Sequence, residues 1–315
     1  DSCVFEGLEK MEVVFIEAID QFPLDNKWEV ALFNLINACF TKDSKLFFSS
    51  TVPAKDLEVR LPDLKSRLLA FPAFELPELT DEEKIKALKE PTDLIVLPEM
   101  FTTGFSMNAE RLAEEQNSTS LTWLKTTAKK YEVAITGSVI IQENENNYNR
   151  LFFVFPNGDY QIYDKKHLFT LANEQHTYSA GKNRLIVDYK GWKVCPLICY
   201  DLRFPVWSRN TEDFDLLLYV ANWPKKRTEA WDALLKARSI ENMCYVAGVN
   251  RVGLDGNDHE YSGHSAVYDM LGKQISTAKN DKVIFAETLH LNKTELTKTR
   301  KRFAFLNDRD AFTLT

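Results

Sequence analysis

From residue 93 onward the chain is a series of short apolar segments separated by polar turns and amphipathic stretches. Each apolar run spans five to eight residues and is rich in Val, Ile and Leu, which is typical of a strand buried in a sheet. Helical periodicity over residues 120–130 and 228–242 lies between such runs. Strands that alternate with helices predict an α/β fold of sheets layered against helices. The runs are residues 93–97, 133–140, 149–155, 194–198, 216–220 and 245–249.

Composition excludes several classes of protein. The 315 residues carry a formal net charge of −7. Because nucleic acid and anionic membranes bind clusters of Lys and Arg, we expect this chain to bind neither. No apolar run approaches the roughly 18 residues of a membrane span. The N-terminus shows no secretory signal and the five cysteines are scattered, which favours a cytoplasmic protein with free thiols. Since neither a metal-ligand cluster nor a phosphate loop is present, we expect no cofactor.

Three reactive side chains each follow an apolar strand segment. Glu99 stands in LIVLPEMFTTGF, Lys165 in YDKKHLFT and Cys199 in PLICYDLRFP. Catalytic groups gather at the C-terminal ends of strands in layered α/β folds, so we expect the three to lie together. A carboxylate can take the thiol proton and so generate a thiolate nucleophile. The lysine ammonium and the backbone N–H of Tyr200 can then stabilise the oxyanion of a tetrahedral intermediate.

Each of these residues also has an ordinary structural interpretation. A cysteine at the end of an apolar strand is most often a small buried hydrophobe, and Cys195 and Cys244 fit that description. A Pro-Glu pair after a strand is commonly a turn, and a Lys-Lys pair is commonly solvated surface. The segment GHS at residues 263–265 lacks the second glycine of a serine-hydrolase elbow, so we dismiss a serine nucleophile there.

The strings around the three residues resemble the motifs of the nitrilase superfamily. LPEMFTTGF is similar to its glutamate motif, YDKKHLF to its lysine motif and ICYDLRFP to its cysteine motif. The resemblance implies that Glu99 is the general base, Lys165 the oxyanion-stabilising lysine and Cys199 the nucleophile. The lysine motif reads Lys, any residue, His, Leu, which selects Lys165 over the lysine that follows it. Glu174, in NEQHTYSAG, matches a second glutamate that orients the lysine and helps to position substrate.

Further strings are similar to the bacterial omega-amidase branch of that superfamily. They are ANWPKKRTEAWDALLKARSIEN, GVNRVGLDGNDHEYSGHSAV and RFAFLNDRDAFTL. The resemblance implies a homo-oligomer and a small-molecule amide substrate such as 2-oxoglutaramate, hydrolysed through a cysteine thioester. The carboxylate of such a substrate needs an arginine, and we expect Arg203 or Arg227 to bind it, with Trp223 in the same pocket. For Arg227 a second interpretation carries equal weight: KKR at residues 225–227 is simply the solvated first turn of a helix.

Residues 1–90 have a different character. MEVVFIEAIDQF, KLFFSSTVPAKDL and LPDLKSRLLAF are similar to the Walker B, sensor and arginine-finger segments of DnaA/Hda-type AAA+ ATPases, with Arg67 as the finger. Ala18 replaces the second acid of Walker B and no phosphate loop exists, so ATP hydrolysis is not expected. The local patterns predict strands over residues 11–16 and 45–49, a helix over residues 27–40, and a further helix from the capping box TDEE at residues 80–83.

We therefore expect two domains: an incomplete AAA+ fragment at residues 1–90, and an α-β-β-α sandwich of four layers at residues 91–315. The nitrilase resemblance implies a first strand and long helix before the glutamate motif, and neither is recognisable here. Residues 11–16 are the candidate for a substitute strand. The leading hypothesis is a carbon–nitrogen hydrolase acting on linear amides. The alternatives are a regulatory module that docks a DnaA-like partner through residues 1–90, and an inactive fusion or hybrid.

Overall fold

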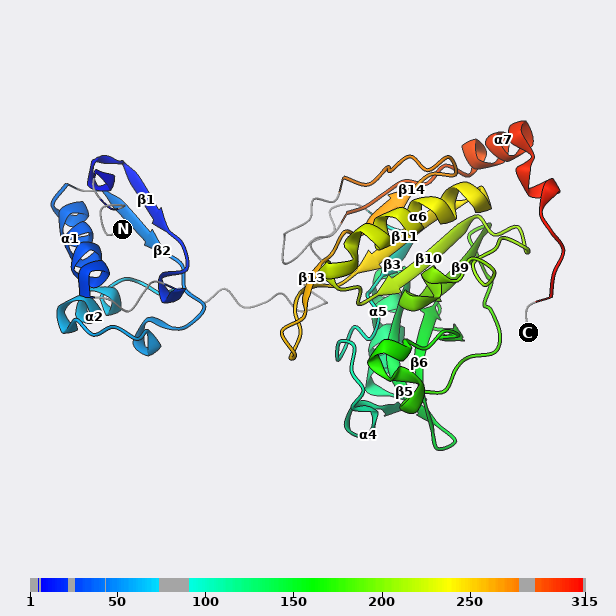
Figure 1. Cartoon of the computed structure of the whole chain (residues 1–315), viewed down its shortest axis with the longest axis horizontal. Helices are drawn as coiled ribbons and strands as arrows, with labels where there is room; N and C mark the ends of the chain where they lie inside the picture. Colours follow the sequence, from blue (N-terminus) through cyan, green and yellow to red (C-terminus); the bar gives the residue numbers. More distant parts are fainter. Residues whose placement is uncertain are drawn as a thin grey trace. The chain divides into compact units, whose positions relative to one another are not determined.

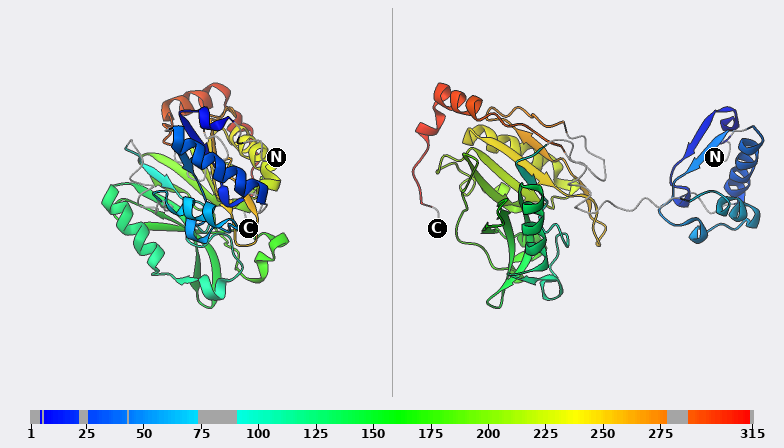
Figure 2. Two further views of the ribbon diagram at one scale, coloured as in Figure 1. Left: turned by 90° about the vertical axis from the view of Figure 1, so that its left-hand side faces the viewer. Right: turned by 180° about the vertical axis from the view of Figure 1, so that it is seen from behind.

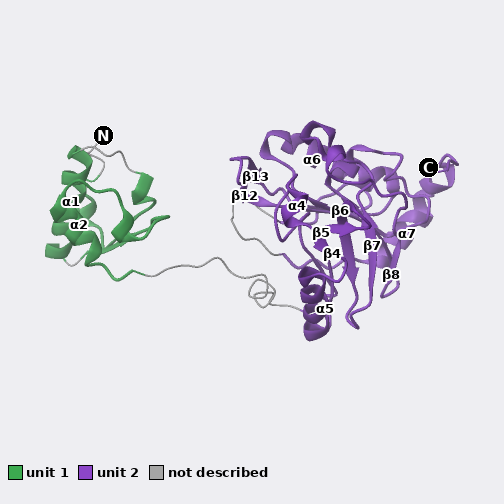
Figure 3. Ribbon diagram, turned by 90° about the horizontal axis from the view of Figure 1, so that it is seen from below, with its two compact units in different colours: residues 1–78 green, residues 79–315 purple. Residues whose placement is uncertain are grey.

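The chain folds into two compact units, residues 1–78 and 79–315 (Figure 3). The computed structural model describes residues 5, 7–21, 26–42, 44–73, 91–277 and 287–313. The helix expected from residue 80 lies outside the described residues. Glu99, Lys165 and Cys199 all belong to the second unit, so the fold of that unit determines whether they meet.

The first unit packs two parallel strands against helices. β1 (Val13–Ile16) pairs in parallel with β2 (Lys45–Phe48), and α1 (Asn26–Lys42) connects them. The apolar side of α1 packs with α2 (Pro62–Leu69) in a small core of its own. These elements confirm the strands and the helix expected before residue 50. The pairing partner of residues 11–16 is therefore β2, within the same unit.

The second unit contains two larger sheets (Figure 1). The first has the order β3-β5-β6-β7, with the short β4 (Glu114–Glu115) beside β5; its members are β3 (Leu94–Val96), β5 (Ala134–Glu143), β6 (Asn146–Val154) and β7 (Tyr160–Asp164). The second has the order β14-β11-β10-β9-β8, and its three central strands are parallel; its members are β8 (Val187–Tyr189), β9 (Trp192–Ile198), β10 (Leu216–Ala221), β11 (Tyr245–Asn250) and β14 (Ala266–Tyr268).

The two sheets face each other and a helix covers the outer face of each (Figures 1 and 2). Side chains of β6 alternate between two cores: Leu151 and Phe153 point to the core between the sheets, whereas Phe152 and Val154 point to the core under α5 (Thr119–Tyr131). On the other side, α6 (Thr228–Asn242) packs on β11 and β14. This arrangement matches the expected α-β-β-α order of layers, and all six expected strands are present.

Smaller elements complete the unit. A β-hairpin of β12 (Val252–Leu254) and β13 (Glu260–Ser262) has its turn in the segment that begins with Asp255-Gly256, and a short helix, α4 (Ala109–Leu112), precedes β4. Helix α7 (Lys293–Phe303) is fastened by Arg300, which donates to the carbonyl oxygens of Met243 and Phe214. The C-terminal segment is thereby tied to the ends of α6 and β10.

β3 is an edge strand of its sheet within the described part of the chain. Its sequence is nevertheless apolar on both faces: Leu94 and Val96 pack toward the core between the sheets and Ile95 toward the core under α5. Such a sequence is typical of a strand with neighbours on both sides. The expectation that a neighbouring strand is missing stays a prediction.

Candidate active site

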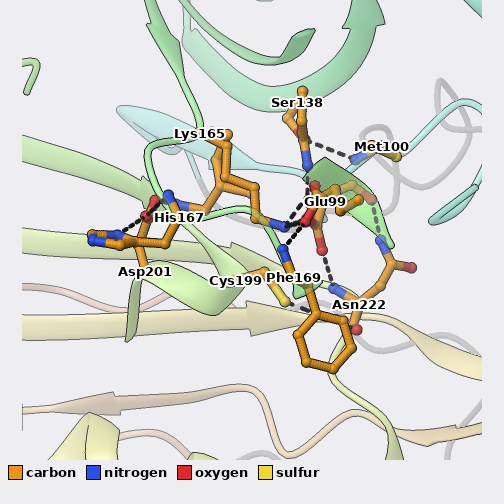
Figure 4. A network of polar contacts seen from close by, with 12 residues as sticks. Glu99, Met100, Ser138, Lys165, His167, Phe169, Cys199, Asp201 and Asn222 are labelled. Atoms are coloured by element: carbon orange, nitrogen blue, oxygen red, sulfur yellow. Dashed lines mark hydrogen bonds and ion pairs between the residues drawn. The ribbon is translucent and has the colours of Figure 1, made fainter. Parts of the chain in front are cut away.

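Lys165 is enclosed between two carboxylates just after the end of β7 (Figure 4). Its Nζ donates to Glu99 Oε1 at 2.9 Å and to both carboxylate oxygens of Glu174 at 3.0 Å. None of the three side chains is more than 1% exposed. Because a buried charge is tolerated only when it is paired and hydrogen-bonded, each of these groups depends on the others.

The Glu99 carboxylate is also held by two asparagines. It accepts a hydrogen bond from Asn149 Nδ2 at 2.8 Å and another from the backbone N–H of Asn222 at 2.9 Å. The Asn222 side chain donates in turn to the Glu99 carbonyl oxygen at 2.6 Å. Sequence reasoning missed both asparagines, because a single Asn within or after an apolar strand forms no motif.

Cys199 lies at the turn that follows β9. Its backbone has a φ of 42°, a left-handed conformation that costs a non-glycine residue about 1–3 kcal/mol. The residue is partly exposed, and its Sγ lies 3.9 Å from the carbonyl oxygen of Asn222. Burial, reinforced by the charge of Glu99, raises the pKa of the thiol well above its usual value, and Lys165 opposes this only in part. At rest Cys199 is therefore a thiol, and a base would have to take its proton before the sulfur could act as a nucleophile.

The charges of the cluster reinforce the protonated state of Lys165. Burial alone would lower the pKa of this lysine, but the neighbouring Glu174 and Glu99 outweigh burial and raise it. Burial also raises the pKa of Glu174, against the opposing effect of Lys165. The site thus presents a fixed cation next to a neutral thiol, which suits attack on a carbonyl group followed by stabilisation of an oxyanion.

A pocket over Cys199 is lined largely by aromatic and cationic side chains. The guanidinium of Arg203 lies 5.0 Å from the centre of the Trp223 ring, and that of Arg227 lies 5.1 Å from the centre of the Phe169 ring. Neither arginine forms an ion pair with a carboxylate of the described residues. The lining consists of Phe105, Lys165, Phe169, Cys199, Tyr200, Arg203, Asn222, Trp223, Pro224, Arg227 and Tyr261.

The structure places the sequence-predicted residues in two groups. Glu99, Lys165, Glu174 and Cys199 form the polar cluster, whereas Tyr200, Arg203, Trp223 and Arg227 lie in the pocket wall. Arg67 lies on α2 of the first unit. Across the described ranges, no group of three or more His, Cys, Asp or Glu side chains could hold a metal ion.

Comparison with known proteins gives a family match. The model of the carbon–nitrogen hydrolase family matches residues 57–298. The chain belongs to the carbon–nitrogen hydrolase family. An omega-amidase, YafV, of Yersinia enterocolitica is 46% identical over 222 residues, which are 70% of this chain and 86% of that protein. A 2-oxoglutaramate amidase of Bacillus subtilis is 38% identical over 207 residues, 64% of this chain and 80% of the relative.

A solved structure with 44% sequence identity covers most of this chain. It is a CN-hydrolase superfamily protein of Xanthomonas campestris with an arsenic adduct in its active site. The two share 44% sequence identity and a TM-score of 0.71, over 73% of this chain and 89% of the other. The family match begins at residue 57, before the boundary between the two units at residues 78 and 79.

Among the described helices, none has both the length and the apolar character needed to cross a membrane.

The enclosed lysine gives a prediction about stability. Replacing Lys165 with Met leaves Glu99 and Glu174 buried and facing each other without a cation, so we expect a loss of about 3–5 kcal/mol in the free energy of unfolding at pH 7. The deficit should shrink as the pH falls, because protonation removes the uncompensated negative charge. Urea unfolding measures it, with the exposed Lys182→Met as matched control. Equal stability of the two variants at pH 7 would contradict the interdependence of the three charges.

Proposed function

We propose that this carbon–nitrogen hydrolase removes ammonia from the side-chain amide of a small carboxylate-bearing substrate of the 2-oxoglutaramate type. The observation that carries the proposal is the Cys199 thiol next to the buried Glu99–Lys165–Glu174 cluster. The names of the relatives, omega-amidase and 2-oxoglutaramate amidase, support the substrate class. We also propose that the protein is a homo-oligomer and that it is cytoplasmic.

The arrangement supports a reaction in two stages. In the first, Glu99 takes the thiol proton while Cys199 Sγ attacks the amide carbon, and Lys165 with the backbone N–H of Tyr200 stabilises the oxyanion. Glu99 then returns the proton to the leaving nitrogen, so that ammonia departs and a thioester forms. In the second stage Glu99 takes a proton from water, the resulting hydroxide attacks the thioester, and the proton returns to the sulfur as the carboxylic acid leaves. Glu174 keeps Lys165 in place throughout.

Two arginines in the pocket wall support a substrate that carries a carboxylate. Arg203 and Arg227 bring positive charge to the wall of the pocket, each beside an aromatic ring. A guanidinium binds a carboxylate through paired hydrogen bonds, while the ring beside it limits its motion. Arg227 is half-buried rather than fully solvated, which supports its pocket role over the alternative of a solvated helix start.

Ammonia release from 2-oxoglutaramate tests the proposed activity. Cys199→Ala should lower turnover by at least about 10³-fold, because it removes the nucleophile, and Glu99→Gln by about 10²- to 10⁴-fold, because it removes the base. Cys195→Ala is the matched control: this cysteine lies in β9, the strand that precedes Cys199, and is buried in the core, so the variant should keep its activity. A folded wild-type chain that releases no ammonia would contradict the proposal and favour the regulatory or inactive alternatives.

The role of the arginines predicts a change in substrate preference. Arg203→Met and Arg227→Met should each lower kcat/KM for 2-oxoglutaramate by about 10- to 150-fold, the equivalent of a lost hydrogen bond to a charged group. The same variants should leave hydrolysis of pentanamide, which has no carboxylate, nearly unchanged. Lys226→Met serves as control, because this exposed cation lies next to Arg227 but not in the pocket wall. Equal losses on both substrates would show that the arginines act on the fold instead.

The first unit has a separate candidate role, docking to a DnaA-like partner through an AAA+ remnant. Two parallel strands joined by a helix, with Glu17 directly after β1, are compatible with that resemblance. A cleft beside Trp28 and Glu29 contains no cysteine, lysine or histidine among its lining residues. Binding of purified DnaA by residues 1–90 would support this role, and it would not bear on the amidase activity of the second unit.

A further inference from the structure

A second buried carboxylate lies close to the catalytic cluster. Asp201 is fully buried and accepts four hydrogen bonds. Its Oδ1 accepts from the backbone N–H of His167 at 3.0 Å and contacts His167 Nδ1 at 2.8 Å. Its Oδ2 accepts from the Tyr163 hydroxyl at 2.7 Å and from the backbone N–H of Ile198 at 3.0 Å. The reaction as described assigns no chemical step to this group.

The partners of Asp201 flank the two catalytic residues in sequence. Tyr163 and His167 stand two residues before and two residues after Lys165. Ile198 directly precedes Cys199, and Asp201 itself follows it by two residues. One carboxylate therefore connects the segment that carries the ammonium to the segment that carries the thiol. Figure 4 shows the contact between His167 and Asp201 beside the catalytic cluster.

The turn at Cys199 needs such support. Its left-handed backbone persists only if the surrounding structure holds it. Asp201 provides this hold, because its side chain reaches back to the N–H of Ile198 and closes the turn around the cysteine. Without that bond the backbone at Cys199 could relax to a commoner conformation, and Sγ would move away from Glu99.

His167 extends the support to the wall of the pocket. Its ring stacks on Phe204, with ring centres 3.6 Å apart and planes inclined by 6°. Phe204 directly follows Arg203, one of the arginines proposed to bind the substrate carboxylate. The Tyr163 hydroxyl also accepts a hydrogen bond from Trp207 Nε1 at 3.0 Å. Both sides of the Asp201 carboxylate are thus anchored in packed aromatic side chains.

We propose that Asp201 and His167 are positioning residues that fix the distance and orientation between Cys199 Sγ and Lys165 Nζ. The inference rests on the proposed amidase function for its kinetic consequences, but not for its structural ones. His167 acts through the hydrogen bond from Nδ1 and through its ring, and it touches neither the substrate nor the reacting atoms. A misplacement of about 1 Å between reacting groups can cost about 100-fold in rate, so a bond this close to both residues controls turnover.

Two variants of His167 separate the hydrogen bond from the packing. His167→Phe keeps a ring for stacking on Phe204 but removes the donor, whereas His167→Asn keeps a donor near the position of Nδ1. We expect His167→Phe to lower kcat by about 10- to 100-fold, with KM for 2-oxoglutaramate within about twofold of wild type, because only transition-state contacts are lost. His167→Asn should recover most of the lost kcat. Equal losses in the two variants, or an unchanged kcat in His167→Phe, would overturn the proposal.

Alkylation of Cys199 by iodoacetamide gives a readout that does not require the amidase function. Its rate, followed by mass spectrometry of the Cys199 peptide, should change in His167→Phe and return toward wild type in His167→Asn. Asp232→Asn is the matched control, because it alters another half-buried His–Asp contact, that of His264 at 3.0 Å, and should leave the rate unchanged. Thermal melts must show each variant folded at the assay temperature.

Tyr163→Phe provides an independent variant should His167→Phe fail to fold. It removes only the hydroxyl that donates to Asp201, and it should lower kcat and change the alkylation rate in the same direction. If wild type releases no ammonia but alkylation follows the expected order, the proposed function fails and the positioning role stands. If wild type is active and neither His167→Phe nor Tyr163→Phe alters kcat or alkylation, the positioning role is wrong.

Discussion

A protonated lysine held between two buried carboxylates is the interaction on which the rest of the site depends. Removing Lys165 leaves Glu99 and Glu174 as two uncompensated negative charges out of contact with water, whereas removing either glutamate leaves a single buried Lys–Glu pair. The three side chains come from separate segments of the chain, so the folded structure must bring those segments together and hold them. The Lys165 ammonium therefore has two effects in the proposed reaction: it neutralises buried carboxylate charge in the folded protein, and it can stabilise an oxyanion.

The two sheets contribute different parts of the reaction centre. Residues in or shortly after strands of the first sheet supply the charges and their support: Glu99 after β3, Asn149 in β6 and Lys165 after β7. Residues directly after strands of the second sheet supply Cys199, after β9, and Asn222, after β10. Packing between the sheets therefore sets the distance between Glu99 and Cys199. Asp201 adds a polar connection between the two sheets, because it accepts hydrogen bonds from Tyr163 in β7 and from Ile198 in β9.

Sequence reasoning could predict the elements whose signals are local. Runs of Val, Ile and Leu gave the buried strands, and the strings around Glu99, Lys165 and Cys199 gave the reactive residues. It could not predict Asn149 and Asn222, whose roles arise only when strands distant in sequence become neighbours. The short strands at the sheet edges, such as β8 and β14, were also missed, because three residues carry little periodicity. For residues 11–16 the strand was predictable, but its pairing with β2 follows from tertiary packing.

In the proposed reaction the acyl group is transferred to Cys199 Sγ, and the most direct test is to detect that thioester bond. The chain is mixed with 2-oxoglutaramate, quenched rapidly in acid and measured by intact-protein and peptide mass spectrometry. We expect an adduct equal in mass to the substrate less ammonia, on the Cys199 peptide of wild type and absent from Cys199→Ala. Steady ammonia release with no adduct at any quench time, or an adduct on another residue, would contradict the account.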